Sequence, residues 1–285
     1  MSLRDRAIDA VWAWAAGLGP VGRSRLQRVW GRTVGRLPLR GQRQWAANVL
    51  DATGVAPTRG DVREASSSWL RNALESVSLE NWTGAQIDDA VVIGEDDWAR
   101  LRASFASRGT VLALGHLGSW DLCGAWVGRR GMPVSSVAER LPDARFEHFL
   151  EARAAVGMRI HSLDEPDLMS ALAHDVTDGR LVCLLADRDL KRNGVEVRWP
   201  TPSGGRAITV PPGPALLARR TGADLMTVIS HYEGDRMRIT IGQPISHASG
   251  RDGLAAMMQA VVDDIAAGVA ARPVDWHVFG RFFRS

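Results

Sequence analysis

VLALGHLGSWD, residues 111–121, is the stretch of sequence that decides the fold. An apolar run at 111–114 is followed at once by a glycine-containing turn and then by an apolar, helix-like segment, 119–128. A short buried strand that turns directly into a helix is typical of an α/β sheet. Ligands bind at the carboxyl ends of the strands in such sheets, so we expect His116 to lie at a functional edge.

Similar apolar runs alternate with helix-like stretches further along the chain. Strands are predicted at 111–114, 134–138, 158–162, 181–186, 225–230 and 236–242, and helices near 119–128, 143–156, 166–177, 212–222 and 252–270. This alternation predicts an α/β fold with a central, mostly parallel sheet flanked by helices. Residues 1–100 are predicted to be mainly helical and to pack on an α/β catalytic body at 105–285. No linker separates the two parts, so we predict a single domain over 1–285.

An amphipathic helix is predicted over 21–37, beside further helices at 4–16 and 61–82. One side of it carries basic residues at helical spacing: Arg25, Arg28, Arg32 and Arg36. The opposite side is apolar: Leu26, Trp30, Val34 and Leu37. A basic helix with tryptophan on its apolar side is typical of a membrane surface. A surface helix that packs into its own domain is the alternative.

Composition narrows the classes of protein. The 285 residues are 45% hydrophobic and 24% charged, which indicates a globular rather than a disordered or coiled-coil chain. No apolar run approaches about 18 residues, so no transmembrane helix is expected. Cys123 and Cys183 lie in apolar stretches and form no CxxC pair, which argues against a zinc site or a disulfide framework. Lys191 is the sole lysine, and the resulting arginine excess fits either codon usage or phosphate binding.

His116 and a nearby carboxylate form a candidate acid–base pair. A neutral imidazole can take the proton of a hydroxyl near neutral pH, and a carboxylate behind it fixes its tautomer. Asp121 would lie about 140° from His116 on a straight helix, so it reaches the ring only if His116 lies in the preceding turn. Gly115 and Gly118 allow that turn, whose N–H groups can stabilise an oxyanion. The spacing alone is weak, and a structural histidine that caps the helix is the alternative.

Residues 115–121 resemble the H-x4-D block of glycerolipid and lipid A acyltransferases. Further blocks that resemble the same group are VAERL (137–141), FLEAR (149–153), LADRDL (185–190), RNGV (192–195), PGPA (212–215) and PVDWH (273–277). Together they are similar to the lipid A biosynthesis acyltransferase superfamily, most of all to its actinobacterial phosphatidylinositol mannoside acyltransferases.

The resemblance implies a glycerolipid acyltransferase-like fold and a particular reaction. A fatty acyl group would pass from acyl-CoA to a glycolipid hydroxyl, most simply on a mannose of a phosphatidylinositol mannoside. His116 would be the general base, with Asp121 and Asp187 as catalytic acids. Relatives carry glutamate at the position of Asp187, so which of the two acids orients His116 stays open. The implied substrate-binding residues are Glu139, Arg140, Arg153 and Arg188.

The same resemblance implies the partners and the location. Acyl-CoA, such as palmitoyl-CoA, is the expected co-substrate, with no bound cofactor and no metal. The other expected partners are an anionic glycolipid and the membrane surface, and no nucleic acid is expected as a partner. The expected location is peripheral, on the cytoplasmic face of the cell membrane. A lipid A-type, lysophospholipid or other glycerolipid acyltransferase that uses acyl-CoA or acyl carrier protein is one alternative. A non-catalytic membrane-binding module is another. A hydrolase is disfavoured because no G-x-S-x-G elbow occurs.

Overall fold

The computed structural model describes residues 14–15, 17–33, 37, 39–139, 144–189, 194–202 and 204–283, without the side chains of residues 20, 21 and 144–148. Nearly all of the predicted helix 4–16 lies outside these ranges, as do Val34, Arg36 and Arg140.

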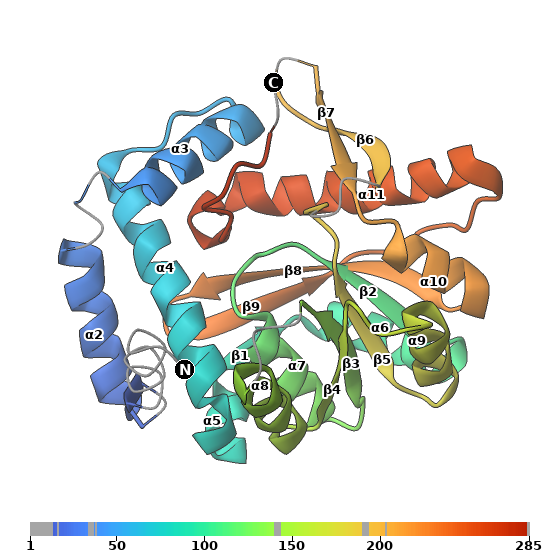
Figure 1. Ribbon diagram of the computed structural model, residues 1–285, viewed down its shortest axis with the longest axis horizontal. Helices are drawn as coiled ribbons and strands as arrows, with labels where there is room; N and C mark the ends of the chain where they lie inside the picture. Colours follow the sequence, from blue (N-terminus) through green and yellow to red (C-terminus); the bar gives the residue numbers. More distant parts are fainter. Residues whose placement is uncertain are drawn as a thin grey trace.

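The described residues of the N-terminal third are largely helical. Its elements are α2 (Pro20–Thr33), α3 (Arg40–Thr53), α4 (Arg59–Ser78), the 3-10 turn η2 (Leu79–Asn81), α5 (Gly84–Asp89) and α6 (Glu95–Ser107). The long helix α4 begins at a capping box, in which Thr58 accepts from the N–H of Asp61 and Asp61 accepts from the N–H of Thr58. Figure 1 shows α4 running beside the sheet, with α2 on its outer side.

The centre of the molecule is a sheet with the order β1-β9-β8-β2-β5-β3-β4. Its strands are β1 (Val91–Ile93), β2 (Thr110–Leu114), β3 (Val134–Ala138), β4 (Met158–Ser162), β5 (Leu181–Leu185), β8 (Asp224–Glu233) and β9 (Arg236–Ile241). Only the β8–β9 pair is antiparallel among these described strands. The predicted mostly parallel α/β sheet is therefore confirmed.

Helices cover both faces of this sheet and create two apolar cores. The remaining helical elements are α7 (Trp120–Gly128), α8 (Ala144–Ala155), α9 (Leu168–Thr177), α10 (Gly213–Thr221), α11 (Gly250–Ala271) and η3 (Pro273–Asp275). Figure 1 places α11 on one side of the sheet and α7 on the other. Alternate residues of β2 divide accordingly: Val111 and Ala113 join the core beneath α11, whereas Leu112 and Leu114 join the core beneath α7.

A two-stranded hairpin, β6 (Val195–Trp199) and β7 (Arg206–Val210), is absent from the sequence-based prediction. It projects above α11 in Figure 1 and buries Val197 and Trp199 against the core of that side. Its signal is a period of two, since Val195, Val197 and Trp199 alternate with charged residues.

Within the described ranges, α11 is long and apolar enough by length and composition to cross a membrane. Its residues Met257, Val261 and Ile265 are fully buried against the sheet, as in the core helix of a globular protein.

The strand order brings two candidate residues together. β5 lies beside β2 in parallel, and Leu114 at the end of β2 is opposite Leu185 at the end of β5. His116 and Asp187 each follow their strand by two residues, so they emerge side by side at the carboxyl edge of the sheet.

Candidate active site

His116 and Asp187 form a direct pair. The His116 imidazole donates through Nδ1 to Asp187 Oδ1 at 2.5 Å, and the main-chain N–H of His116 donates to Asp187 Oδ2 at 3.0 Å. The carboxylate is fully buried, whereas 20% of the imidazole is exposed. Because Nδ1 carries the hydrogen that faces the carboxylate, Nε2 is left with a free lone pair.

Trp276 completes the surroundings of Asp187. Its indole N–H donates to Asp187 Oδ2 at 3.1 Å, so this oxygen accepts two hydrogen bonds while the other oxygen faces the imidazole. Burial raises the pKa of Asp187, but the electrostatic interaction with His116 and the hydrogen bonds from His116 and Trp276 lower it more, and the pKa lies below its usual value. Asp187 therefore stays ionised although it is buried.

Asp121 lies in the first turn of α7 and bonds elsewhere. Its Oδ2 accepts from the Arg153 guanidinium at 2.7 Å and from the Ser76 hydroxyl at 2.5 Å. Both partners of the Asp121–Arg153 ion pair are 7% exposed. Among the described residues, no hydrogen bond joins Asp121 to His116. The carboxylate is thus held by Arg153 and Ser76 rather than by the imidazole, although Asp121 and His116 line the same cavity.

The N–H groups of the turn are already used. Those of His116, Leu117 and Gly118 donate to Asp187, to the carbonyl of Gly115 and to the carbonyl of Asp275. The expectation that this turn supplies oxyanion donors is therefore wrong for these three groups. The N-terminus of α7 follows this turn, and the first N–H groups of a helix have no acceptor within the helix. This helix begins at Trp120, and the ring centroids of Trp120 and His116 are 5.7 Å apart.

An apolar cavity of about 630 Å³ opens beside His116, within the size range of small-molecule sites. Its lining includes Ala138 and Leu185 at the carboxyl ends of β3 and β5 and Val134 and Leu181 at their first residues. The cavity therefore follows both strands for about 13 Å beneath α7. A fatty acyl chain has the shape and polarity to fill such a space.

The other predicted substrate residues occupy different environments. Glu139 is exposed and lines the mouth of the main cavity, and Arg188 is half-buried and lines both this cavity and a second one of about 300 Å³. Arg153 is buried, bonds Asp121 and lies 3.8 Å over the ring of Phe149. Arg140 lies outside the described residues.

Two thiols also line the cavity. Burial raises the pKa of Cys183 to about 12, and burial together with the charge of Glu75 raises that of Cys123 further. Thiolates are the nucleophilic form of cysteine, so these side chains are poor nucleophiles while they are protonated.

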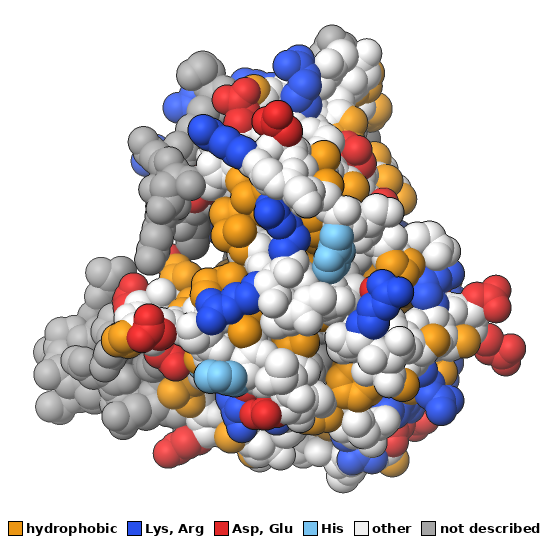
Figure 2. Space-filling model, turned by 90° about the vertical axis from the view of Figure 1, so that its right-hand side faces the viewer, with side chains coloured by type: hydrophobic (Ala, Val, Ile, Leu, Met, Phe, Trp, Pro, Cys, Tyr) orange, Lys and Arg blue, Asp and Glu red, His pale blue; other side chains and the backbone are white. Residues whose placement is uncertain are grey.

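The predicted basic helix, α2, has its apolar side partly packed. The ring of Trp30 stacks on Trp69 of α4 with centroids 6.5 Å apart, while Arg25, Arg28 and Arg32 are exposed. Trp69 itself stays 40% exposed, and Val29 on α2 is 57% exposed. On the face drawn in Figure 2, by contrast, basic side chains are interspersed with acidic and apolar ones.

These features define an α/β protein with a carboxylate-paired histidine at the mouth of an apolar cavity. The family model for the bacterial lipid A biosynthesis acyltransferases matches residues 10–285, and the chain belongs to that family. It is therefore an acyltransferase by family.

Similar proteins carry a more specific name. The chain is 35% identical over 222 residues to a phosphatidylinositol mannoside acyltransferase of Mycolicibacterium smegmatis. The aligned residues cover 76% of this chain and 70% of the relative. The chain is also 37% identical over 176 residues to a protein of the same name from Mycobacterium tuberculosis. Here the aligned residues cover 61% of this chain and 54% of the relative.

Proposed function

We propose that this protein transfers a fatty acyl group from acyl-CoA to a mannose hydroxyl of a phosphatidylinositol mannoside, with His116 as the general base. The observation that carries the proposal is the His116–Asp187 pair at the mouth of the apolar cavity. The names of the relatives support the choice of acceptor.

The pair is suited to direct transfer. The acceptor hydroxyl loses its proton to Nε2 of His116 as its oxygen attacks the thioester carbonyl. The Asp187 carboxylate stabilises the imidazolium that forms. The C–S bond then breaks, the ester is released, and the coenzyme thiolate takes the proton back from the imidazolium. The protein itself need not be acylated, in keeping with the protonated state of Cys123 and Cys183.

Each lipid part has a matching surface. The acyl chain lies in the cavity beneath α7, and the guanidinium of Arg188, which faces both cavities, binds a phosphate of a substrate. Glu139 at the cavity mouth accepts hydrogen bonds from the acceptor sugar. The exposed arginines of α2 and the exposed Trp69 and Val29 bring the protein to an anionic lipid surface, on the cytoplasmic face where acyl-CoA is made.

The test is an incubation of the protein with labelled palmitoyl-CoA and a panel of acceptors. The panel contains a phosphatidylinositol mannoside, a lysophospholipid and a lipid A precursor. Each acceptor is also tried with palmitoyl-loaded acyl carrier protein as the donor. We expect acylation of the mannoside from acyl-CoA and a loss of at least about 100-fold in His116→Ala, as for removal of a general base. Transfer to another acceptor would replace the proposed substrate, and full activity of His116→Ala would remove the mechanism.

A further inference from the structure

One tripeptide, Asp275–His277, contacts both members of the His116–Asp187 pair. Its backbone pairs with the turn at 116–118, since the N–H of Gly118 donates to the carbonyl of Asp275 at 3.0 Å and the N–H of His277 donates to the carbonyl of His116 at 2.8 Å. Between these two bonds, the side chain of Trp276 reaches Asp187. The tripeptide therefore touches the base through its backbone and the acid through an indole.

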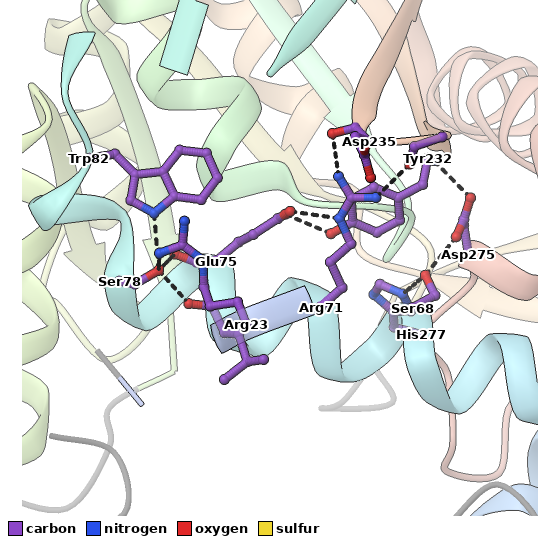
Figure 3. Close-up of polar contacts among 12 residues, drawn as sticks. Arg23, Ser68, Arg71, Glu75, Ser78, Trp82, Tyr232, Asp235, Asp275 and His277 are labelled. Atoms are coloured by element: carbon purple, nitrogen blue, oxygen red, sulfur yellow. Dashed lines mark hydrogen bonds and ion pairs between the residues drawn. The ribbon is translucent and has the colours of Figure 1, made fainter. Parts of the chain in front are cut away.

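A buried polar network holds this tripeptide to α4. Figure 3 shows Ser68 between Asp275 and His277, donating to the carboxylate of Asp275 at 2.6 Å and lying 2.9 Å from Nε2 of His277. Asp275 also accepts from the N–H of Tyr232 at 2.8 Å. Asp275 is 1% exposed and His277 is 8% exposed, so water does not compete for these bonds.

Helix α3 holds the same segment from the other side. The indole of Trp45 donates to the carbonyl of Trp276 at 2.9 Å. The amide of Asn48 donates to the carbonyls of Val278 and Gly280 at 2.9 and 2.7 Å. With its backbone fixed by α3, by α4 and by the turn, Trp276 has little freedom to move its N–H away from Asp187.

We propose that Trp276 is a positioning residue that acts through Asp187. The indole N–H and the main-chain N–H of His116 together hold Oδ2, so the carboxylate cannot rotate and Oδ1 stays aimed at the imidazole. The proposal rests on the proposed function of the His116–Asp187 pair.

The chain offers a matched control for the test. Trp199 is also fully buried, and it stacks on Trp276 with centroids 5.6 Å apart, but its N–H has no partner among the described residues. Trp276→Phe and Trp199→Phe therefore remove similar volumes, and only the first removes a hydrogen bond. We expect Trp276→Phe to lower kcat about 10- to 100-fold, as for loss of a bond to a charged group, with KM for both substrates unchanged. Trp199→Phe should stay within about threefold, as a buried substitution that removes little volume.

A double mutant separates positioning from structural damage. If Trp276 acts through Asp187, then Trp276→Phe should change kcat by less than about threefold when Asp187→Asn is already present. Additive losses, equal losses in the two phenylalanine variants, or an unchanged kcat in Trp276→Phe would each overturn the proposal. The proposed function is tested separately by His116→Ala and the acceptor panel, so its failure can be told apart from a failure of the positioning role of Trp276.

Discussion

Replacement of Asp187 by asparagine tests the central pair through the tautomer of His116. In the native site, Oδ2 accepts two N–H groups and Oδ1 accepts the Nδ1 hydrogen. An asparagine would keep its carbonyl oxygen where two donors converge. Its NH₂ group would then occupy the position of Oδ1 and face Nδ1.

The expected size of the effect follows from that geometry. A donor opposite Nδ1 forces this nitrogen to become the acceptor, so the single ring hydrogen moves to Nε2. An imidazole protonated at Nε2 cannot take the proton of the acceptor hydroxyl. The equivalent change of tautomer in the Ser-His-Asp triad costs about 10⁴-fold in kcat, and we expect a loss of the same order here.

The assay follows release of coenzyme A thiol in the presence of acceptor lipid, with Asp121→Asn as the control. That variant removes the same charge from a carboxylate that faces Arg153 and Ser76. It leaves a buried arginine unpaired, so it should lower the free energy of unfolding by about 3–5 kcal/mol and spare the tautomer. The reasoning fails if Asp187→Asn keeps more than about a tenth of the activity. It also fails if folded Asp121→Asn loses as much kcat as Asp187→Asn.

Three further outcomes are expected. Val127 lines the cavity about 10 Å along α7 from the start of this helix. Val127→Phe adds about four carbon atoms to the cavity wall, so the preferred acyl-CoA in a chain-length series should become shorter by about four methylenes. An unchanged chain-length preference would place the acyl chain elsewhere. Burial, together with the electrostatic interaction with His116, lowers the pKa of His277 to about 3. Between that value and about 6.5 the unfolded chain binds one more proton than the folded chain, so the free energy of unfolding falls as pH falls, by up to about 1.4 kcal/mol per pH unit. Urea unfolding measured from pH 7 to 5 should show that the free energy of unfolding depends less on pH in His277→Gln than in the native protein. Equal slopes in the two proteins would contradict the lowered pKa of His277. Replacement of Arg25, Arg28 and Arg32 by glutamine should weaken flotation with anionic vesicles about 100-fold at low salt; equal recovery of the native protein with neutral and anionic vesicles would exclude electrostatic docking.

Strands with clear boundaries are predictable from the sequence. Val134–Ala138 and Met158–Ser162 coincide with their predicted ranges, because Gly131 and Pro133 precede the first and Gly157 precedes the second. β1 has only the residues Val91–Ile93, too few to show a period, and it gains its place by pairing with β9 from the other end of the chain.

The partners of the charged residues are less predictable, because they depend on strand order and helix packing. Asp187 meets His116 because β5 returns to lie beside β2, which no local pattern shows. Arg153 has acidic neighbours on its own helix, yet it pairs with Asp121 from α7. Trp276 is fully buried, and its bond to Asp187 joins two residues 89 positions apart in the sequence.

The contact between Trp45 and Trp276 joins residues 231 positions apart. During synthesis, α3 leaves the ribosome long before its partner segment exists, since domains emerge from the N-terminus at about 5–20 residues per second. An incomplete chain would hold His116 without the indole that steadies its acid. The complete hydrogen-bonded surroundings of Asp187 would therefore form only when the segment around Trp276 docks against α3.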